Sequence, residues 1–172
     1  MPNPPTRRPA DAPGPEKDAS RALSDAADLV TMAVREDVGP GDVTSEATLP
    51  ADLQAEAHVV ARSDGMPAGL WIVPMVYDIL GTSVSVEGHA EDGDRFEAGR
   101  HLATLRGPAA EILRGERTML NFLQRLCGVA TLTRTYVDAV AHTGARIVDT
   151  RKTTPGWRRL EKYAVRCGGA TN

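Results

Sequence analysis

Residues 145–169 have the pattern of a strand, a loop and a helix in direct succession. The segment "ARIVDT" is apolar and suits a strand, and Pro155-Gly156 forces a turn before the helical stretch that begins at Trp157 and stops at two glycines. This order forms one unit of a βα pattern. In α/β barrels and open α/β sheets, ligands bind at the C-terminal ends of the strands. The loop after residue 150 is therefore a candidate ligand site.

The segments before residue 145 contain both helical and β-strand patterns. A helical repeat runs from Ser20, and strong turn signals follow it at Gly39-Pro40-Gly41. Alternating apolar residues then predict strands, and a stretch with Pro74 in its first turn favours a helix over a buried strand. The predicted order is a strand at 55–63, a helix at 70–80, and strands at 82–88 and 101–107.

A long helical pattern begins at Pro108, a residue that suits the first position of a helix. Its apolar stripe contains the acid Glu116, which predicts a charge inside the packed face or at its edge. Gly128 predicts a break, after which a second helix should run to Gly144. The first stripe comprises Ala109, Ile112, Glu116, Leu120, Leu123 and Cys127, and the second comprises Leu132, Tyr136 and Val140.

Charge is distributed unevenly along the chain. Residues 1–105 hold 8 Lys/Arg and 18 Asp/Glu, a net charge of −10, whereas residues 106–172 hold 12 and 5, a net charge of +7. A basic half indicates an anionic partner, either nucleic acid or a phosphorylated or carboxylated small molecule. Aromatic residues make up only 4% of the chain, which argues against the base-stacking surfaces of nucleic-acid-binding proteins.

Other features place the chain in a broad class. Six prolines within the first fifteen residues predict a disordered tail over residues 1–18, and this tail lacks the apolar core of a secretory signal. No segment approaches the ~20 unbroken apolar residues of a membrane span. Cys127 and Cys167 are too few for a disulfide framework, so we predict reduced thiols in a cytoplasmic protein. The spacing of the four histidines predicts no protein-bound metal site.

Two sets of residues are candidates for binding chemistry. In the segment "DTRKTTPG", Arg151 offers a planar fork for a carboxylate or phosphate, and Lys152 offers a compact positive charge, with threonine hydroxyls beside them. The alternative for this pair is a solvated basic loop. Arg117 lies beside the apolar stripe, and its alternative is an internal or surface ion pair. On spacing alone, both alternatives are favoured over a binding role.

Four segments, taken in order, resemble one enzyme family. They are "REDVGPGDVTSEAT", "ARSDGMPAGL", "DGDRFEAGRHLATLRGPAAEILRGERTMLNFLQRLCGVATLT" and "DTRKTTPGWRRLEKYAVRCGGATN". In this order and spacing they resemble quinolinate phosphoribosyltransferase, the carboxylating nicotinate-nucleotide pyrophosphorylase of NAD biosynthesis, over about residues 29–172. Two departures are mild: Cys127 stands where the family usually has serine, and "GGA" replaces the commoner "GGG".

The resemblance implies a fold and a reaction. The fold would be an α+β, sandwich-like N-terminal domain over residues 19–116, followed by the start of a TIM-like α/β barrel over residues 117–172. The family joins quinolinate to phosphoribosyl pyrophosphate, which carries Mg²⁺, and yields nicotinate mononucleotide, pyrophosphate and CO₂. Both substrates bear several negative charges, so arginine, lysine and Mg²⁺ are suited to bring them together.

The resemblance also implies roles for individual residues. Arg151 and Lys152 would line the anion site, Thr150 would contribute from the end of the strand, and Lys152 is the candidate catalytic residue. Arg117 would reach into the site of a neighbouring subunit, which predicts a homodimer or a higher homo-oligomer. The expected partners are thus the two small-molecule substrates and further copies of the chain, without nucleic acid or membrane.

The family continues beyond the position of Asn172 with a His-Arg pair and further substrate-binding residues. The resemblance therefore predicts a C-terminally truncated enzyme that is inactive as a 172-residue chain alone. Two alternatives stay open. One is a molybdenum-transport-associated homologue of the same fold, against which "TTPGWRRLEKYAVR" argues, and the other is an inactive fragment that acts only in association.

Overall fold

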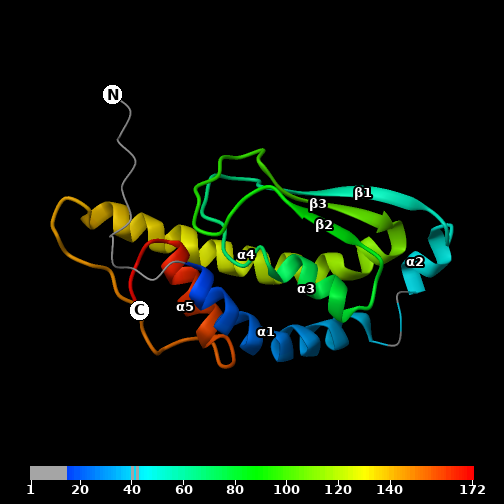
Figure 1. Cartoon of the computed structure of the whole chain (residues 1–172), viewed down its shortest axis with the longest axis horizontal. Helices are drawn as coiled ribbons and strands as arrows, with labels where there is room; N and C mark the ends of the chain where they lie inside the picture. Colours follow the sequence, from blue (N-terminus) through cyan, green and yellow to red (C-terminus); the bar gives the residue numbers. More distant parts are fainter. Residues whose placement is uncertain (1–14, 40, 42) are drawn as a thin grey trace.

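The fold was analysed in a computed structural model, which describes residues 15–39, 41 and 43–172 (Figure 1). The predicted tail of residues 1–18 lies mostly outside the described residues, and its last four residues begin the first helix. The elements are α1 (Pro15–Val38), α2 (Val43–Thr48), β1 (Gln54–Val60), α3 (Ile72–Ile79), β2 (Ser85–Gly88), β3 (His101–Pro108), α4 (Ala109–Val140) and α5 (Arg158–Cys167).

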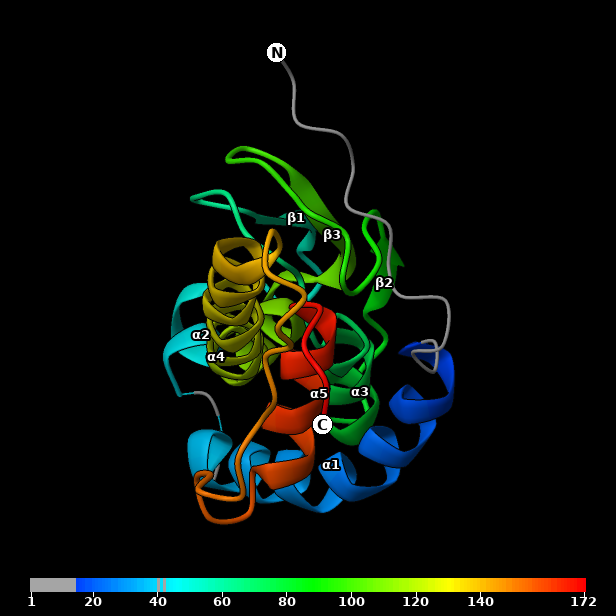
Figure 2. The ribbon, with the colours of Figure 1, turned by 90° about the vertical axis from the view of Figure 1, so that its left-hand side faces the viewer.

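The three strands form an antiparallel sheet in the order β1-β3-β2. One face of this sheet packs on α4, and α3 lies beside α4 beneath the sheet (Figures 1 and 2). Helices α1 and α5 pack against this layer and against each other. The sheet alternates apolar residues toward the helices with polar residues toward the outside, which is the pattern of a sheet covered on one face. The predicted sandwich-like N-terminal domain is confirmed.

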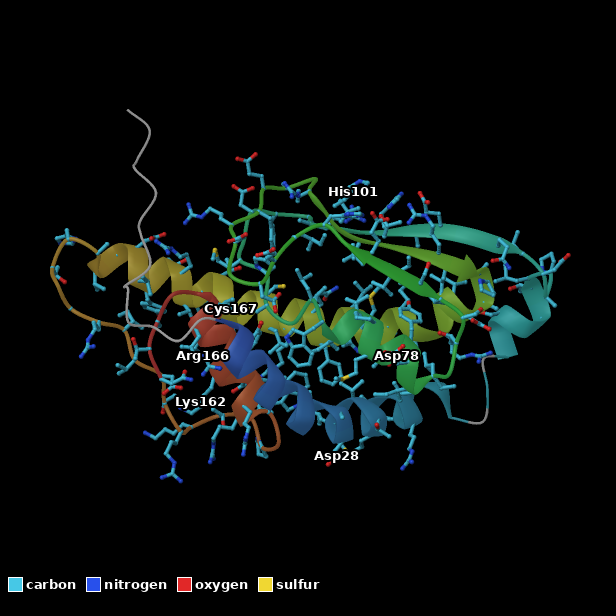
Figure 3. All side chains as sticks on the ribbon, in the orientation of Figure 1. Asp28, Asp78, His101, Lys162, Arg166 and Cys167 are labelled. Carbon is cyan, nitrogen blue, oxygen red and sulfur yellow. The ribbon has the colours of Figure 1, made fainter. Side chains whose placement is uncertain are left out.

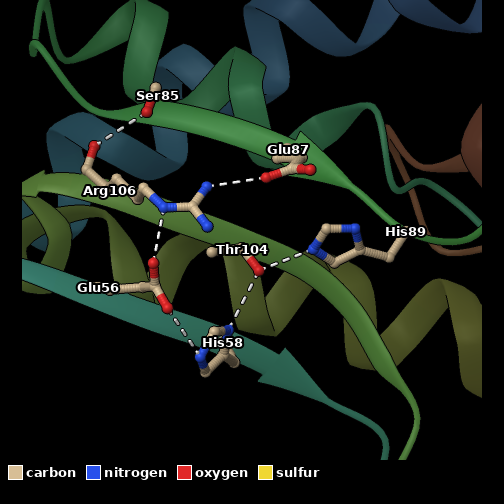
Figure 4. A network of polar contacts seen from close by, with 7 residues as sticks. All are labelled: Glu56, His58, Ser85, Glu87, His89, Thr104 and Arg106. Atoms are coloured by element: carbon tan, nitrogen blue, oxygen red, sulfur yellow. Dashed lines mark hydrogen bonds and ion pairs between the residues drawn. The ribbon is translucent and has the colours of Figure 1, made fainter.

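Polar side chains on the open face tie the central strand to both edge strands (Figure 4). The hydroxyl of Thr104 on β3 lies 3.1 Å from Nδ1 of His58 on β1 and 2.7 Å from Nε2 of His89, just beyond β2. Arg106 forms ion pairs with a glutamate of each edge strand, at 2.6 and 2.8 Å. Thr104 is buried, so these contacts satisfy a polar group that would otherwise lose its water partners.

Helix α4 is one continuous helix of 32 residues, and the predicted break at Gly128 is wrong. Gly128 lies in its middle and faces outward, and a side chain added there would meet nothing within 4 Å. A glycine inside a helix costs only about 1 kcal/mol relative to alanine. The burial of apolar residues on both sides of Gly128 outweighs this cost, because tertiary packing dominates helix stability in proteins.

The buried face of α4 also differs from the predicted one. Glu116 is exposed, and Leu132 and Tyr136, predicted to point inward, are 59% and 57% exposed. Apolar residues occur on more than one side of this helix, so periodicity alone did not identify the stripe that the sheet and α5 cover. The buried residues are Ala109, Ile112, Gly115, Thr118, Met119, Phe122, Leu123, Leu126, Ala130 and Thr133.

Close packing between α3 and α4 depends on one glycine. The buried ring of Tyr77 lies against Gly115, and its hydroxyl donates a hydrogen bond to the main-chain oxygen of Ile112 (2.9 Å). A Cβ atom added at Gly115 would lie 2.5 Å from Cε1 of the Tyr77 ring. The ring is fixed at its hydroxyl end, so it has little freedom to move away.

The chain on either side of α5 forms the beginning of a barrel. The predicted strand at 145–150 is reduced to a bridge, in which Val148 pairs in parallel with Thr171. Thr171 N donates to Ile147 O (3.1 Å), and Asp149 N donates to Thr171 O (3.0 Å). Two parallel segments joined by a helix make a βαβ unit, so the predicted barrel start is confirmed. The predicted domain boundary at residue 116 lies inside α4.

Two alanine substitutions within α4 should have opposite effects. We expect Gly115→Ala to lower the free energy of unfolding by about 1–3 kcal/mol, because the new methyl group overpacks against Tyr77. We expect Gly128→Ala to raise it by up to about 1 kcal/mol, because alanine removes the cost of glycine where space is open. Urea unfolding followed by circular dichroism measures both changes. Equal effects at the two sites would contradict the packing described here.

Candidate anion-binding site

The loop between residues 150 and 157 follows the first parallel segment at its C-terminal end. The hydroxyl of Thr150 accepts a hydrogen bond from Lys152 N (3.1 Å), which turns the chain outward. Gly156 has a φ of +81°, a conformation that favours glycine and that leads the chain into α5. The side chains of Arg151 and Lys152 are exposed, and no acid of the described residues forms an ion pair with them. The predicted pair lies at the start of the loop, directly after Thr150.

The two acids nearest this loop are both paired with other cations. Asp149 forms an ion pair with Lys162 of α5, which is labelled in Figure 3. The Asn172 amide, oriented so that its nitrogen donates, also reaches Asp149 Oδ2 (2.9 Å). Glu161 of α5 forms an ion pair with Arg125 of α4. Neither carboxylate is therefore available to Arg151 or Lys152.

Glu161 is held in its ionised form by its neighbours. Burial alone would raise its pKa, but hydrogen bonds from Arg125 and from Thr154, together with the charge of Arg125, outweigh burial and lower this pKa below its ordinary value. The main-chain N–H of Thr154 contributes one of these bonds, at 3.3 Å. The carboxylate thus joins the loop to the first turn of α5.

Aromatic contacts attach the end of the loop to α4. The rings of Phe122 and Trp157 stack with their centres 4.7 Å apart, and the Arg125 guanidinium lies 5.4 Å from the centre of the Trp157 ring. A hollow of about 330 Å³ opens beside this end of the loop. Its lining excludes Thr150, Arg151 and Lys152, so the hollow and the predicted residues are adjacent but distinct. The lining residues are Thr153, Thr154, Pro155, Gly156, Arg158, Arg159 and Leu160.

Arg117 lies apart from this loop within the chain. It lies eight residues before Arg125 on α4, about 12 Å along the helix axis from the arginine that contacts the loop, and its partner Asp37 lies in the last turn of α1. Its side chain is 75% exposed and forms an ion pair with Asp37, at 2.6 Å. The alternative of an ion pair is thus present, and Arg117 is not brought together with Arg151 and Lys152 in one chain.

A polar contact that the sequence did not reveal joins α5 to the N-terminal domain. The carboxylate of Asp92 accepts hydrogen bonds from the main-chain N–H groups of Gly69 (2.7 Å) and Leu70 (3.1 Å) and from the hydroxyl of Tyr163 (2.6 Å). Burial and the charge of Asp92 raise the pKa of Tyr163. The turn signal at Asp92 was visible in the sequence, but its partner 71 residues away was not.

Thiol and metal chemistry have few candidates in the described part of the chain. Burial raises the pKa of the Cys127 thiol to about 11, which keeps it protonated and weakly nucleophilic at neutral pH. No three His, Cys, Asp or Glu side chains among the described residues are placed to hold a metal ion.

None of the described helices combines the length and apolar character that crossing a membrane requires.

The βαβ unit places the chain among the α/β-barrel proteins, in which ligands bind at the C-terminal ends of the strands, and the basic loop lies at this end. Family models named "Quinolinate phosphoribosyl transferase" match the chain over residues 42–127 for the N-terminal domain and 129–172 for the C-terminal domain. The chain belongs to the quinolinate phosphoribosyltransferase family. This result confirms the resemblance found in the sequence.

Individual relatives agree with the family models. The chain is 47% identical over 137 residues to a probable nicotinate-nucleotide pyrophosphorylase [carboxylating] of Bacillus subtilis, covering 80% of this chain and 47% of that protein. It is 42% identical over 145 residues to quinolinate phosphoribosyltransferase [decarboxylating] 1b of Nicotiana tabacum, covering 84% and 41%. The solved nicotinate-nucleotide pyrophosphorylase of Francisella tularensis superposes with a TM-score of 0.83 at 33% identity, covering 87% and 53%. The chain spans about half the length of these relatives.

The ionised state of Glu161 gives the site a dependence on pH. The folded state binds the proton of Glu161 more weakly than the unfolded state, so the carboxylate contributes stability above its ordinary pKa of 4.5. This contribution is lost as the pH falls through the lowered pKa of the folded state. We expect the difference in free energy of unfolding between the wild type and Glu161→Gln to be largest near neutral pH and to shrink below about pH 4.5. A difference that stays constant down to about pH 3, measured by urea unfolding, would contradict this assignment.

Proposed function

We propose that the protein transfers the phosphoribosyl group of phosphoribosyl pyrophosphate to quinolinate, with decarboxylation, to give nicotinate mononucleotide, pyrophosphate and CO₂. Family membership and the printed names of the relatives support this reaction. The observation that carries the proposal is the exposed pair Arg151 and Lys152, which lies within the segment that the C-terminal family model matches and forms no ion pair with an acid of the described residues. The relatives' names favour this reaction over a role in molybdenum transport.

The chemistry suits a site built from fixed positive charges. Quinolinate carries two carboxylates, and its co-substrate carries a phosphate and a pyrophosphate, so the two repel each other unless cations lie between them. A transition state of oxocarbenium character needs no protein nucleophile, and positioning with charge stabilisation supplies the rate enhancement. In this proposal Arg151 binds a carboxylate through its planar fork, Lys152 is the catalytic residue that stabilises the developing charge, and Thr150 adds a hydroxyl at the strand end.

Magnesium enters the proposal as part of a substrate. The described residues place no cluster of acids for a metal ion, and the acid nearest the loop, Asp149, is paired with Lys162. Mg²⁺ would therefore arrive bound to phosphoribosyl pyrophosphate, where it offsets the charge of the leaving pyrophosphate. We further propose that the protein acts in the cytoplasm as a homodimer or higher homo-oligomer.

Substitutions of Arg151 and Lys152 test the reaction in protein expressed from its complete reading frame. We expect Lys152→Ala to lower kcat/KM at least about a hundredfold, because it removes a charge that stabilises the transition state. We expect Arg151→Lys to raise the KM for quinolinate, because an ammonium cannot form the bidentate contact of a guanidinium. Release of labelled CO₂ from quinolinate measures both effects, with Arg95→Gln as the control. A wild-type protein without this activity would refute the proposed function.

A second experiment tests whether Arg117 acts across the subunit interface. Its exposed side chain, and its position about 12 Å along α4 from Arg125, which contacts the loop of its own chain, support a contribution to a neighbour's site. We expect Arg117→Ala to weaken quinolinate binding, and mixtures of Arg117→Ala and Arg151→Ala subunits to regain part of the lost activity, because some mixed dimers contain one intact site. If mixing restores nothing although subunit exchange is confirmed, the pair with Asp37 is purely structural.

A further inference from the structure

We propose that Arg125 is a positioning residue of the anion site. It attaches the loop of residues 150–157 to α4 and neutralises Glu161, so that Arg151 and Lys152 stay available for an anionic substrate. The inference rests on the proposed function for the identity of that substrate. Its structural part concerns the described residues alone and can be tested without any activity.

Arg125 contacts three successive parts of the segment that carries the loop. Its Nη2 atom donates a hydrogen bond to the hydroxyl of Thr154 (2.5 Å), and the same nitrogen forms the ion pair with Glu161. Its guanidinium also lies over the ring of Trp157, 5.4 Å from the ring centre. These contacts fix the middle of the loop, its last residue and the first turn of α5 to one point on α4.

The contacts of Arg125 with the loop begin at Thr154, two residues after Lys152. Between Lys152 and Thr154 the chain has little freedom, since Arg158 donates to the hydroxyl of Thr153 (3.3 Å) and to the main-chain oxygen of Arg151 (3.4 Å). A shift of Thr154 away from Arg125 would therefore move Arg151 and Lys152 with it. Stacking of Trp157 on Phe122 resists separation, but stacking is less directional than a charge-assisted hydrogen bond.

The charge of Arg125 is the second reason to assign it this role. The segment from residue 149 to residue 172 contains two acids, Asp149 and Glu161, among several cations. Asp149 has its partner, Lys162, within the same segment, whereas Glu161 takes its partner, Arg125, from α4. The Glu161 side chain is only 14% exposed, so without Arg125 it would be a poorly hydrated charge in need of another cation. The cations of the loop would be drawn toward it and away from a ligand.

The test uses protein expressed from its complete reading frame and four variants. Arg125→Gln removes the charge, Arg125→Lys keeps the charge but loses the fork, and Arg125→Gln combined with Glu161→Gln removes both members of the pair. Arg95→Gln is the matched control, because it deletes another arginine that pairs with an acid of α4, Asp138, outside the loop. Hydrogen exchange over residues 150–160 reports on the loop, and KM and kcat with quinolinate report on the site.

We expect Arg125→Gln to speed hydrogen exchange in the loop and to raise the KM for quinolinate about tenfold, with a smaller change in kcat. Arg125→Lys should lie between this variant and the wild type. The double variant should recover part of the KM but not the slow exchange, because it removes the unpaired carboxylate without restoring the anchor. Loop exchange and KM equal to those of Arg95→Gln would overturn the proposal, and a double variant no better than Arg125→Gln would overturn its electrostatic part.

A variant that fails to fold is replaced by Thr154→Val, which removes the acceptor of Arg125 at an exposed position. It should speed exchange in the loop and raise the KM, and normal values for both would overturn the proposal. A wild-type protein that does not convert quinolinate would refute the proposed function. Hydrogen exchange would then still decide whether Arg125 anchors the loop.

Discussion

Most other elements pack on the long helix α4. At 1.5 Å per residue its 32 residues extend over about 48 Å, and one buried face runs along most of this length. The sheet and α3 pack on its first half, and α5 packs on its second half. The N-terminal domain and the start of the barrel therefore share one helix as a common support. Interrupting this helix would remove the contacts of Arg125 and Phe122 that attach the loop to it.

The continuous helix also fixes the relation between two arginines. Arg117 and Arg125 are separated by about 12 Å along the axis and by about 80° around it. Arg125 faces the loop of its own chain and binds Thr154 and Glu161. Arg117 faces the end of α1 and pairs with Asp37. One helix thus presents one arginine to the loop and another to the end of α1.

The sequence predicted the elements better than it predicted their packing. The three strands of the sheet and the βα order followed from local patterns that a short window contains, and they are confirmed, although the predicted strand at 145–150 is reduced to a bridge. The exposed positions of Leu132 and Tyr136 could not be predicted in this way, because α4 has apolar residues on several sides and only the folded chain determines which side is covered. The prediction of a break at Gly128 was wrong for a related reason. The free-energy cost of a glycine inside a helix is smaller than the stabilisation from packing on both sides of it.

The candidate site, like the fold, could be predicted from the sequence only in part. Arg151 and Lys152 were visible because they follow an apolar strand and precede a Pro-Gly turn. The long-range contacts around α5 were hidden, because Arg125 lies 29 residues before Thr154 and Asp92 lies 71 residues before Tyr163. Contacts of this separation arise only when the helices pack, and no local pattern encodes them. The resemblance to a family led to the proposed reaction, but it did not show which cations bind a ligand and which support the fold.

That distinction follows from the pairing of charges in the basic half of the chain. Its net charge of +7 indicates an anionic partner but does not locate the site. Five cations of this half form ion pairs with acids of the same chain, so their charges are largely neutralised within the fold. They are Arg106, Arg117, Arg125, Arg134 and Lys162. Arg151 and Lys152 have none among the described residues, and the acids nearest to them are already neutralised. Arg151 and Lys152 therefore add two positive charges without an acid partner among the described residues, at the end of the first barrel segment, where the proposed function places its anionic substrates.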